Sequence, residues 1–106
     1  MATQQAVIND LKKFADDILA SGIHLRRLVL FGSYSRNEQK EWSDIDVALA
    51  ADEFNSFGFE DVSLISKVMV KYANLDISPR TYKTIDFTTE KDPFVGEILK
   101  TGIEII

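Results

Sequence analysis

Two carboxylates on one side of a short apolar segment constrain the fold of this chain more than any other feature. Asp44-Ile45-Asp46 opens an apolar run, and strand side chains two residues apart leave the same face. Two such charges repel by about 4 kcal/mol at 4 Å near a protein surface. A strand tolerates them more readily when a divalent cation lies between them, and Mg²⁺ prefers carboxylate oxygens. We therefore predict that Asp44 and Asp46 bind Mg²⁺, while the alternate residues Ile45, Val47 and Leu49 enter a core.

A second polar element precedes this pair by ten residues. The apolar run 28–31 ends in Gly32-Ser33, which we expect to turn into a short helix reaching about Lys40. Backbone N–H groups and a hydroxyl at such a turn can bind a phosphate. A phosphate-binding turn and metal-binding acids together are the minimum equipment for phosphoryl or nucleotidyl transfer.

Two further residues are candidates for contact with a bound nucleotide. Arg36 lies one turn beyond Ser33, within reach of a triphosphate, and Ser43 is adjacent to the acidic pair. An alternative for Arg36 is a surface ion pair with Glu38 or Glu41, which we consider equally compatible with the sequence.

These motifs resemble those of a known superfamily. Gly32-Ser33, ten residues and Asp44-Ile45-Asp46 resemble the signature of polymerase-beta-type nucleotidyltransferases. The longer text GSYSRNEQKEWSDIDVAL and the C-terminal DPFVGEILKTGIEI resemble the minimal nucleotidyltransferases of prokaryotes, which are often antitoxins paired with a helical HEPN toxin. The resemblance implies a nucleotidyltransferase fold, Mg²⁺ as cofactor, and transfer of AMP from ATP to a tyrosine of the HEPN partner.

The superfamily also has a third catalytic carboxylate, on a strand beside the acidic pair. The triplet Leu75-Asp76-Ile77 repeats the apolar-acid-apolar pattern of residues 45–47, so Asp76 is the candidate third metal ligand. Asp86 is a conceivable substitute. With Asp44 and Asp46, Asp76 would activate the attacking hydroxyl.

The remaining pattern predicts one α/β domain over residues 1–106, a small mixed sheet of three or four strands flanked by helices. In the first half we expect helix 3–20 closed by Gly22, strand 26–31 and strand 43–50. Helix 59–73 or 60–73, strand 75–77 ended by Pro79 and irregular chain 80–90 should follow. The last helix should begin at Asp92-Pro93 and end with Gly102 as its left-handed C′ residue, before a terminal strand or tail 103–106.

Charge limits the partners. The net charge is −5, and residues 38–61 hold eight acids and one lysine, so this region would repel a nucleic-acid backbone. We expect the acids outside the motif to be solvated: Glu38, Glu41, Asp52, Glu53, Glu60 and Asp61. No apolar run approaches the ~20 residues of a membrane span, no signal peptide is evident, and there is no cysteine. A cytoplasmic protein that binds neither membrane nor nucleic acid is expected.

Nothing in the 106 residues remains to form a separate substrate-binding domain. The acceptor is therefore expected to be very small or to be supplied by another protein, in a homo- or hetero-oligomer. Candidate interface anchors are Trp42, Phe54, Phe57, Phe59 and the apolar C-terminus. Two alternatives stay open: transfer to a small molecule, as in the related aminoglycoside nucleotidyltransferases, and an antitoxin that acts by binding alone.

Overall fold

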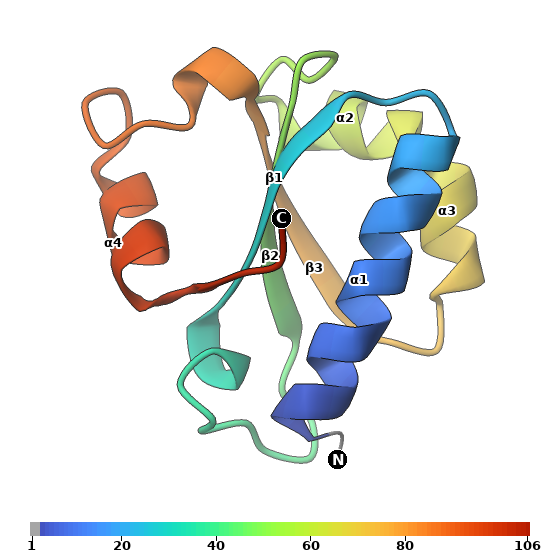
Figure 1. Cartoon of the computed structure of the whole chain (residues 1–106), viewed down its shortest axis with the longest axis vertical. Helices are drawn as coiled ribbons and strands as arrows, with labels where there is room; N and C mark the ends of the chain where they lie inside the picture. Colours follow the sequence, from blue (N-terminus) through green and yellow to red (C-terminus); the bar gives the residue numbers. More distant parts are fainter. Residues whose placement is uncertain (1–2) are drawn as a thin grey trace.

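A four-stranded mixed sheet forms the centre of the molecule (Figure 1). The computed structural model describes residues 3–106. Strand β1 (Leu25–Phe31) lies antiparallel to both β2 (Ile45–Ala51) and β4 (Ile103–Glu104), and β3 (Ile77–Lys83) lies parallel to β2, giving the order β3-β2-β1-β4. The predicted α/β class with a small mixed sheet is confirmed, and the C-terminal residues form a strand rather than a free tail.

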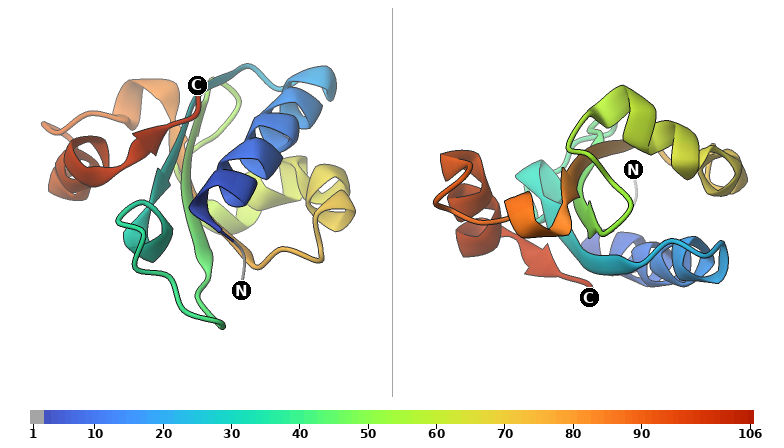
Figure 2. Two further views of the ribbon diagram at one scale, coloured as in Figure 1. Left: turned by 60° about the horizontal axis from the view of Figure 1, so that its bottom comes forward. Right: turned by 90° about the horizontal axis from the view of Figure 1, so that it is seen from above.

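Helices cover both faces of this sheet, as Figures 1 and 2 show. The helices α1 (Gln4–Ala20), α2 (Gly58–Leu64) and α3 (Ser66–Lys71) lie on one side, and α4 (Pro93–Thr101) lies on the other. Two short 3₁₀ helices, η1 (Gly32–Tyr34) and η2 (Thr84–Asp86), follow β1 and β3. None of the helices in residues 3–106 has the length and apolar character needed to cross a membrane.

The alternation of side chains along β1 and β2 divides the interior into two layers. The larger cluster joins α1 to the face that carries Leu28, Leu30, Val47 and Leu49. The smaller cluster joins α4 to the opposite face through Val29, Ala48, Ala50, Tyr82, Phe87, Val95 and Ile98. Asp46 lies on the face of this smaller cluster, because it lies two residues before Ala48. The predicted separation of Asp46 from the core residues Ile45, Val47 and Leu49 is therefore seen in the structure.

The helix ends largely follow the sequence. The Thr3 hydroxyl accepts a hydrogen bond from the N–H of Ala6 at 3.1 Å, and Asp92 Oδ1 accepts one from the N–H of Phe94 at 3.0 Å. Gly22, just after α1, has φ +97° as expected for a left-handed cap. The same prediction for Gly102 is wrong, because its φ is −80°.

Gly102 is required for a different reason, namely the close approach of the chain as it turns from α4 into β4. A side chain at this position would lie 2.4 Å from the carbonyl oxygen of Ile98 and 2.6 Å from Cγ1 of Val29. Only hydrogen fits there.

The expected single helix after residue 58 is two helices. Ile65 leaves the helical conformation, with φ −112° and ψ 16°, and separates α2 from α3. Its side chain is fully enclosed in the larger core cluster, whereas the neighbouring Leu64 is half exposed. The bend thus lets two short helices follow the curved surface of the sheet.

The predicted end of the third strand at Pro79 is also wrong, because β3 continues to Lys83. Pro79 pairs with Val47 in a parallel register in which the N–H of Ile45 donates to the carbonyl of Asp76 at 2.8 Å. In such a ladder the odd-numbered residues of β3 direct their backbone groups away from β2. Pro79 therefore loses no ladder hydrogen bond, as is permitted on an edge strand.

Asp61 was expected at the surface and is instead completely buried. Its carboxylate accepts hydrogen bonds from the N–H groups of Asn55 (2.8 Å) and Phe57 (3.1 Å) and from the hydroxyl of Thr81 (2.8 Å). It ties the loop before α2 to β3, so its role is structural.

Candidate active site

The glycine of the Gly-Ser turn and the second acid of the pair are packed against each other. A methyl group built on Gly32 would lie 2.3 Å from Asp46 Oδ2 and 3.2 Å from its Cγ, and Gly32 has φ +74°. Phe31 pairs with Asp46 across β1 and β2, so the chain turns at Gly32 directly over the carboxylate. Glycine is required here both by the left-handed backbone and by the lack of space.

The helix after this turn is shorter than predicted. η1 ends at Tyr34, and the chain then runs through turns and irregular structure to residue 44. The carbonyl of Ser33 accepts from the N–H groups of Arg36 (3.2 Å) and Glu38 (2.9 Å), and Asn37 has φ 54°, which stops helical propagation. Strand β2 correspondingly starts at Ile45, so Asp44 lies just before the strand.

The carbonyl groups of Gly32 and Ser33 accept hydrogen bonds within the turn, whereas the Ser33 side chain forms none in the part of the chain that the structure describes. The Ser35 hydroxyl donates to the carbonyl of Gly32 at 2.8 Å. Ser33 is half buried, and within residues 3–106 no hydrogen bond engages its hydroxyl. This hydroxyl, one residue beyond Gly32, is available to a ligand.

The electrostatics of the acidic pair match the predicted repulsion. Partial burial, and then the neighbouring charge of Asp44, raise the pKa of Asp46, while the charge of Arg36 acts in the opposite direction. The carboxylate is thus held in a position where its ionised form costs free energy. A bound cation would remove that cost, so the donor chemistry fits a hard divalent metal ion.

Asp76 lies level with the pair along the sheet. It directly precedes Ile77, the partner of Ile45 in the register, and its carbonyl accepts a hydrogen bond from the N–H of Ile45. Its side chain is exposed. Among residues 3–106, however, no three carboxylate, imidazole or thiol side chains are close enough to hold one metal ion, so Asp76 is near the pair without forming a three-carboxylate cluster.

The alternative third acid, Asp86, lies beyond the opposite end of β3. The seven residues of that strand separate it from Asp76 by roughly 20 Å. Its carboxylate accepts from the Ser56 hydroxyl at 2.9 Å and from Lys91 Nζ at 3.0 Å, and these two contacts lower its pKa. Asp86 therefore belongs to a separate network.

Arg36 and Ser43 both make local contacts. Arg36 Nε donates to Glu38 Oε1 at 2.6 Å, with both side chains more than half exposed, which is the ion pair considered from the sequence. Surface pairs of this kind are weak, so the guanidinium can exchange partners. The Ser43 hydroxyl accepts from the N–H of Lys40 at 2.8 Å and closes the turn before Asp44.

Sequence reasoning missed a group of residues on the same sheet face as Asp46. The ring of Phe94 packs edge-on against Phe31 with centroids 5.7 Å apart, and the Arg80 guanidinium lies 4.7 Å from the centre of the Phe94 ring. Arg80 is two residues beyond Ser78, the partner of Asp46 in the register. An extension of the third strand past Pro79 would have placed Arg80 on this face.

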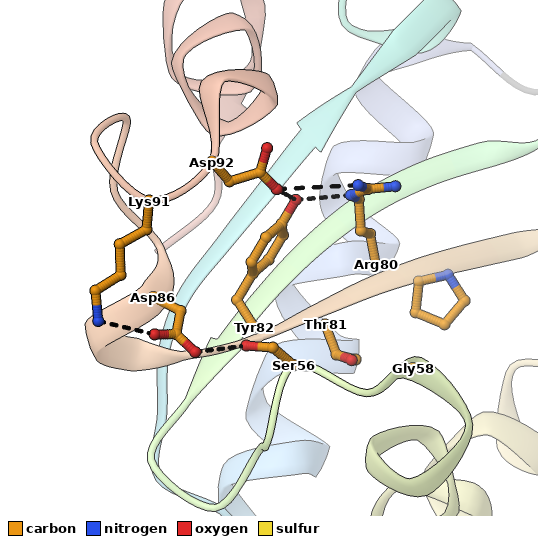
Figure 3. Close-up of a pocket in the computed structure, with 9 residues that line it drawn as sticks. Ser56, Gly58, Arg80, Thr81, Tyr82, Asp86, Lys91 and Asp92 are labelled. Atoms are coloured by element: carbon orange, nitrogen blue, oxygen red, sulfur yellow. Dashed lines mark hydrogen bonds and ion pairs between the residues drawn. The ribbon is translucent and has the colours of Figure 1, made fainter.

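Two hollows flank this group. One, of about 300 Å³, is lined by Phe31, Gly32, Arg36, Phe94 and Ile98 among others. The other, of about 770 Å³, lies beside β3 and is shown in Figure 3. There the Lys91–Asp86–Ser56 contacts form one wall, and Arg80 Nε donates to the Tyr82 hydroxyl at 2.7 Å near Asp92. Space for substrates therefore exists on both sides of Phe94.

Comparisons with known proteins agree with the site. The family model described as "Polymerase beta, Nucleotidyltransferase" matches residues 11–106. Three curated proteins of Methanocaldococcus jannaschii named "Putative protein adenylyltransferase" are similar: MJ0141 is 34% identical over 93% of this chain and 95% of its own length, MJ0435 is 31% identical over 93% and 98%, and MJ1379 is 32% identical over 74% and 78%. No solved structure gives a significant match.

Proposed function

The chain belongs to the polymerase beta nucleotidyltransferase family, and we propose that it transfers AMP from ATP to a tyrosine hydroxyl of a helical HEPN partner, acting as its antitoxin. The observation that carries this proposal is the packing of Gly32 against Asp46. It brings the proposed phosphate-binding turn and the proposed metal-binding carboxylate to one point, where a single triphosphate could contact both. The name of the three relatives supports a protein as the acceptor.

Asp44 and Asp46 are the proposed ligands of Mg²⁺, with Asp76 as the third. Mg²⁺ is usually held by one or two carboxylates together with substrate phosphates, so a pair of acids without a closed protein cage suits it. When bound, the metal neutralises phosphate charge and makes the acceptor hydroxyl more acidic.

The protein groups have distinct tasks in this proposal. The N–H groups at Gly32 and the free hydroxyl of Ser33 bind the phosphates, and Arg36 leaves Glu38 to pair with them. Asp76 takes the proton from the acceptor hydroxyl. The hydroxyl oxygen bonds to the α-phosphorus of ATP, the bond to the β-phosphate breaks, and pyrophosphate leaves. Positioning and charge neutralisation supply most of the rate.

Exposed aromatic side chains at the start of α2 support docking of a protein. Phe57 is 67% exposed and Phe59 is 92% exposed, and Phe59 borders a hollow of about 420 Å³ that Val62 and Pro79 also line. Phe54 is completely buried, so it drops out of the predicted set of anchors. The C-terminal strand packs on the larger core through Ile103 and Ile105, which removes most of that segment as well.

Co-expression with the HEPN protein of a neighbouring reading frame, followed by intact-mass measurement of both chains, tests the proposal. We expect the partner to gain the mass of AMP. Asp44→Asn should abolish the gain, and Glu41→Gln, an exposed acid in the same loop, should not. If the partner never gains AMP while Asp44→Asn still protects cells, the protein neutralises by binding alone.

Metal dependence has a separate readout. ATP with Mg²⁺ should raise the melting temperature, and ATP with a chelator should raise it much less. Saturation at 100 times Kd adds ~2.7 kcal/mol, which is easily detected. Equal shifts in the two conditions would remove the basis for the metal site.

A further inference from the structure

Trp42 is largely exposed in the turn that leads to the acidic pair. It is the only tryptophan of the chain, and its side chain is 78% exposed. It lies in the turn closed by the two hydrogen bonds between Lys40 and Ser43, at 2.8 and 3.0 Å. Within residues 3–106 its ring takes part in none of the aromatic or cation–π contacts. Turns favour small polar residues, so local structure does not explain a tryptophan here.

The position of Trp42 relative to the acidic pair gives it a different use. It precedes Asp44 by two residues, so their Cα atoms are at most about 7 Å apart, a distance that a nucleoside can span from its phosphate. Figure 1 shows the loop between η1 and β2 at the end of the sheet where β1 meets η1 and β2 begins. A triphosphate held by Gly32, Ser33 and the acids would have its base beside this loop.

We propose that Trp42 stacks on the base of the bound nucleotide. This inference rests on the proposed function, because the nucleotide must first be held by its phosphates. A purine base offers a flat π-face of the kind that binds an aromatic side chain. The ring thus supplies a flat base-binding surface two residues from Asp44.

The surroundings of Trp42 favour a small flat ligand over a protein. Lys40 and Glu41 are exposed and charged, and Ser43 is polar, so the ring stands alone. Anchors of protein interfaces lie in larger apolar patches, as Phe59 does beside Val62 and Pro79. Partner contact at Trp42 is a separate outcome of the test below.

Because the chain has a single tryptophan, its fluorescence reports on this position alone. The probes are ATP and inorganic tripolyphosphate, each with Mg²⁺. Both should raise the melting temperature of the whole protein through the phosphate-binding turn. Only ATP should change the tryptophan emission, because tripolyphosphate has no base. Equal changes with the two probes would overturn the proposal.

Three variants complete the test, with Kd measured by calorimetry for both probes. Trp42→Ala should weaken ATP at least about fivefold, the loss expected for one stacked base, and leave tripolyphosphate unchanged. Trp42→Phe should restore most of the ATP affinity. Val70→Ala, which removes part of a similarly exposed apolar side chain on α3, should change neither Kd.

The outcomes separate the two proposals. If ATP and tripolyphosphate both fail to bind, the proposed nucleotidyl transfer itself fails. If both bind and Trp42→Ala leaves the ratio of their Kd values unchanged, the transferase stands and base stacking is refuted. A loss of partner binding in Trp42→Ala, with ATP affinity unchanged, would assign the ring to the protein interface and likewise refute stacking.

Discussion

Replacing Gly32 by alanine separates a cost to stability from a cost to catalysis. Alanine at φ +74° costs roughly 1–2 kcal/mol of folding free energy. The lower entropy of the unfolded alanine chain returns about 0.4–1 kcal/mol, so the net loss is about 1 kcal/mol. For a domain of this size, that lowers the melting temperature by about 4–8 °C.

The effect on activity should be much larger. The new methyl group would lie 2.3 Å from Asp46 Oδ2, roughly 1 Å inside ordinary contact. The carboxylate is the end of a side chain, so it can move aside without unfolding the protein. A displacement of about 1 Å in a catalytic group can cost about 100-fold in rate. We therefore expect Gly32→Ala to fold and to lose at least that much nucleotidyl transfer.

Gly22→Ala is the matched control. Gly22 also has a left-handed backbone, with φ +97°, but nothing lies within 4 Å of a methyl group there. Thermal unfolding, the Mg²⁺-dependent stabilisation by ATP and the rate of AMP transfer are measured for both variants. Both should lose similar stability, and only Gly32→Ala should lose transfer. Equal transfer by the two variants would show that the contact between Gly32 and Asp46 has no part in catalysis.

Three further substitutions test other parts of the site. Asp61→Asn places an NH₂ group against hydrogen-bond donors that now reach a carboxylate. Urea unfolding should therefore show a loss of about 2–4 kcal/mol in the free energy of unfolding, whereas Glu60→Gln should show none. An Asp61→Asn protein as stable as wild type would contradict the structural role of Asp61. Asp76→Asn should abolish transfer and keep some ATP·Mg²⁺ binding, whereas Asp86→Asn should behave as wild type; the reverse would assign the third carboxylate to Asp86. Because the pKa of Asp46 is raised, the contribution of this carboxyl to the stability of the metal-free protein falls as pH rises from about 4 toward neutral, and Asp46→Asn lacks that loss. Unfolding curves should therefore show that the variant is more stable, relative to wild type, at pH 7 than at pH 3.5. An equal difference in free energy of unfolding at the two pH values would refute the raised pKa of Asp46.

The features that could be predicted from sequence are those set by neighbours along the chain. The alternation around Asp46, the cap at Asp92 and the left-handed Gly22 all depend on residues within one turn or one strand. The placement of Gly32 over Asp46 was not itself predicted, although both residues were singled out. Their contact depends on the antiparallel pairing of β1 with β2.

The errors come from tertiary contacts. A proline such as Pro79 would end a central strand, but an edge strand can continue through it. Whether a strand lies at the edge is a property of the whole sheet. Asp61 is buried because Thr81, twenty residues away, reaches it. Ile65 breaks a periodic helix because its side chain enters the core. In each case the decisive partner is distant in sequence.

The outer edge of β3 also limits how this protein can meet others. Pro79 has no N–H, the N–H of Lys83 donates to the Ser56 hydroxyl at 2.8 Å, and that of Ile77 is bonded to Leu75 at 2.9 Å. Of the outward-facing residues of β3, only Thr81 therefore keeps an N–H available. A foreign strand would find almost no ladder to extend at this edge, which is therefore a poor template for strand addition or fibre growth. A partner that meets β3 must instead bind through side chains, as a helix does.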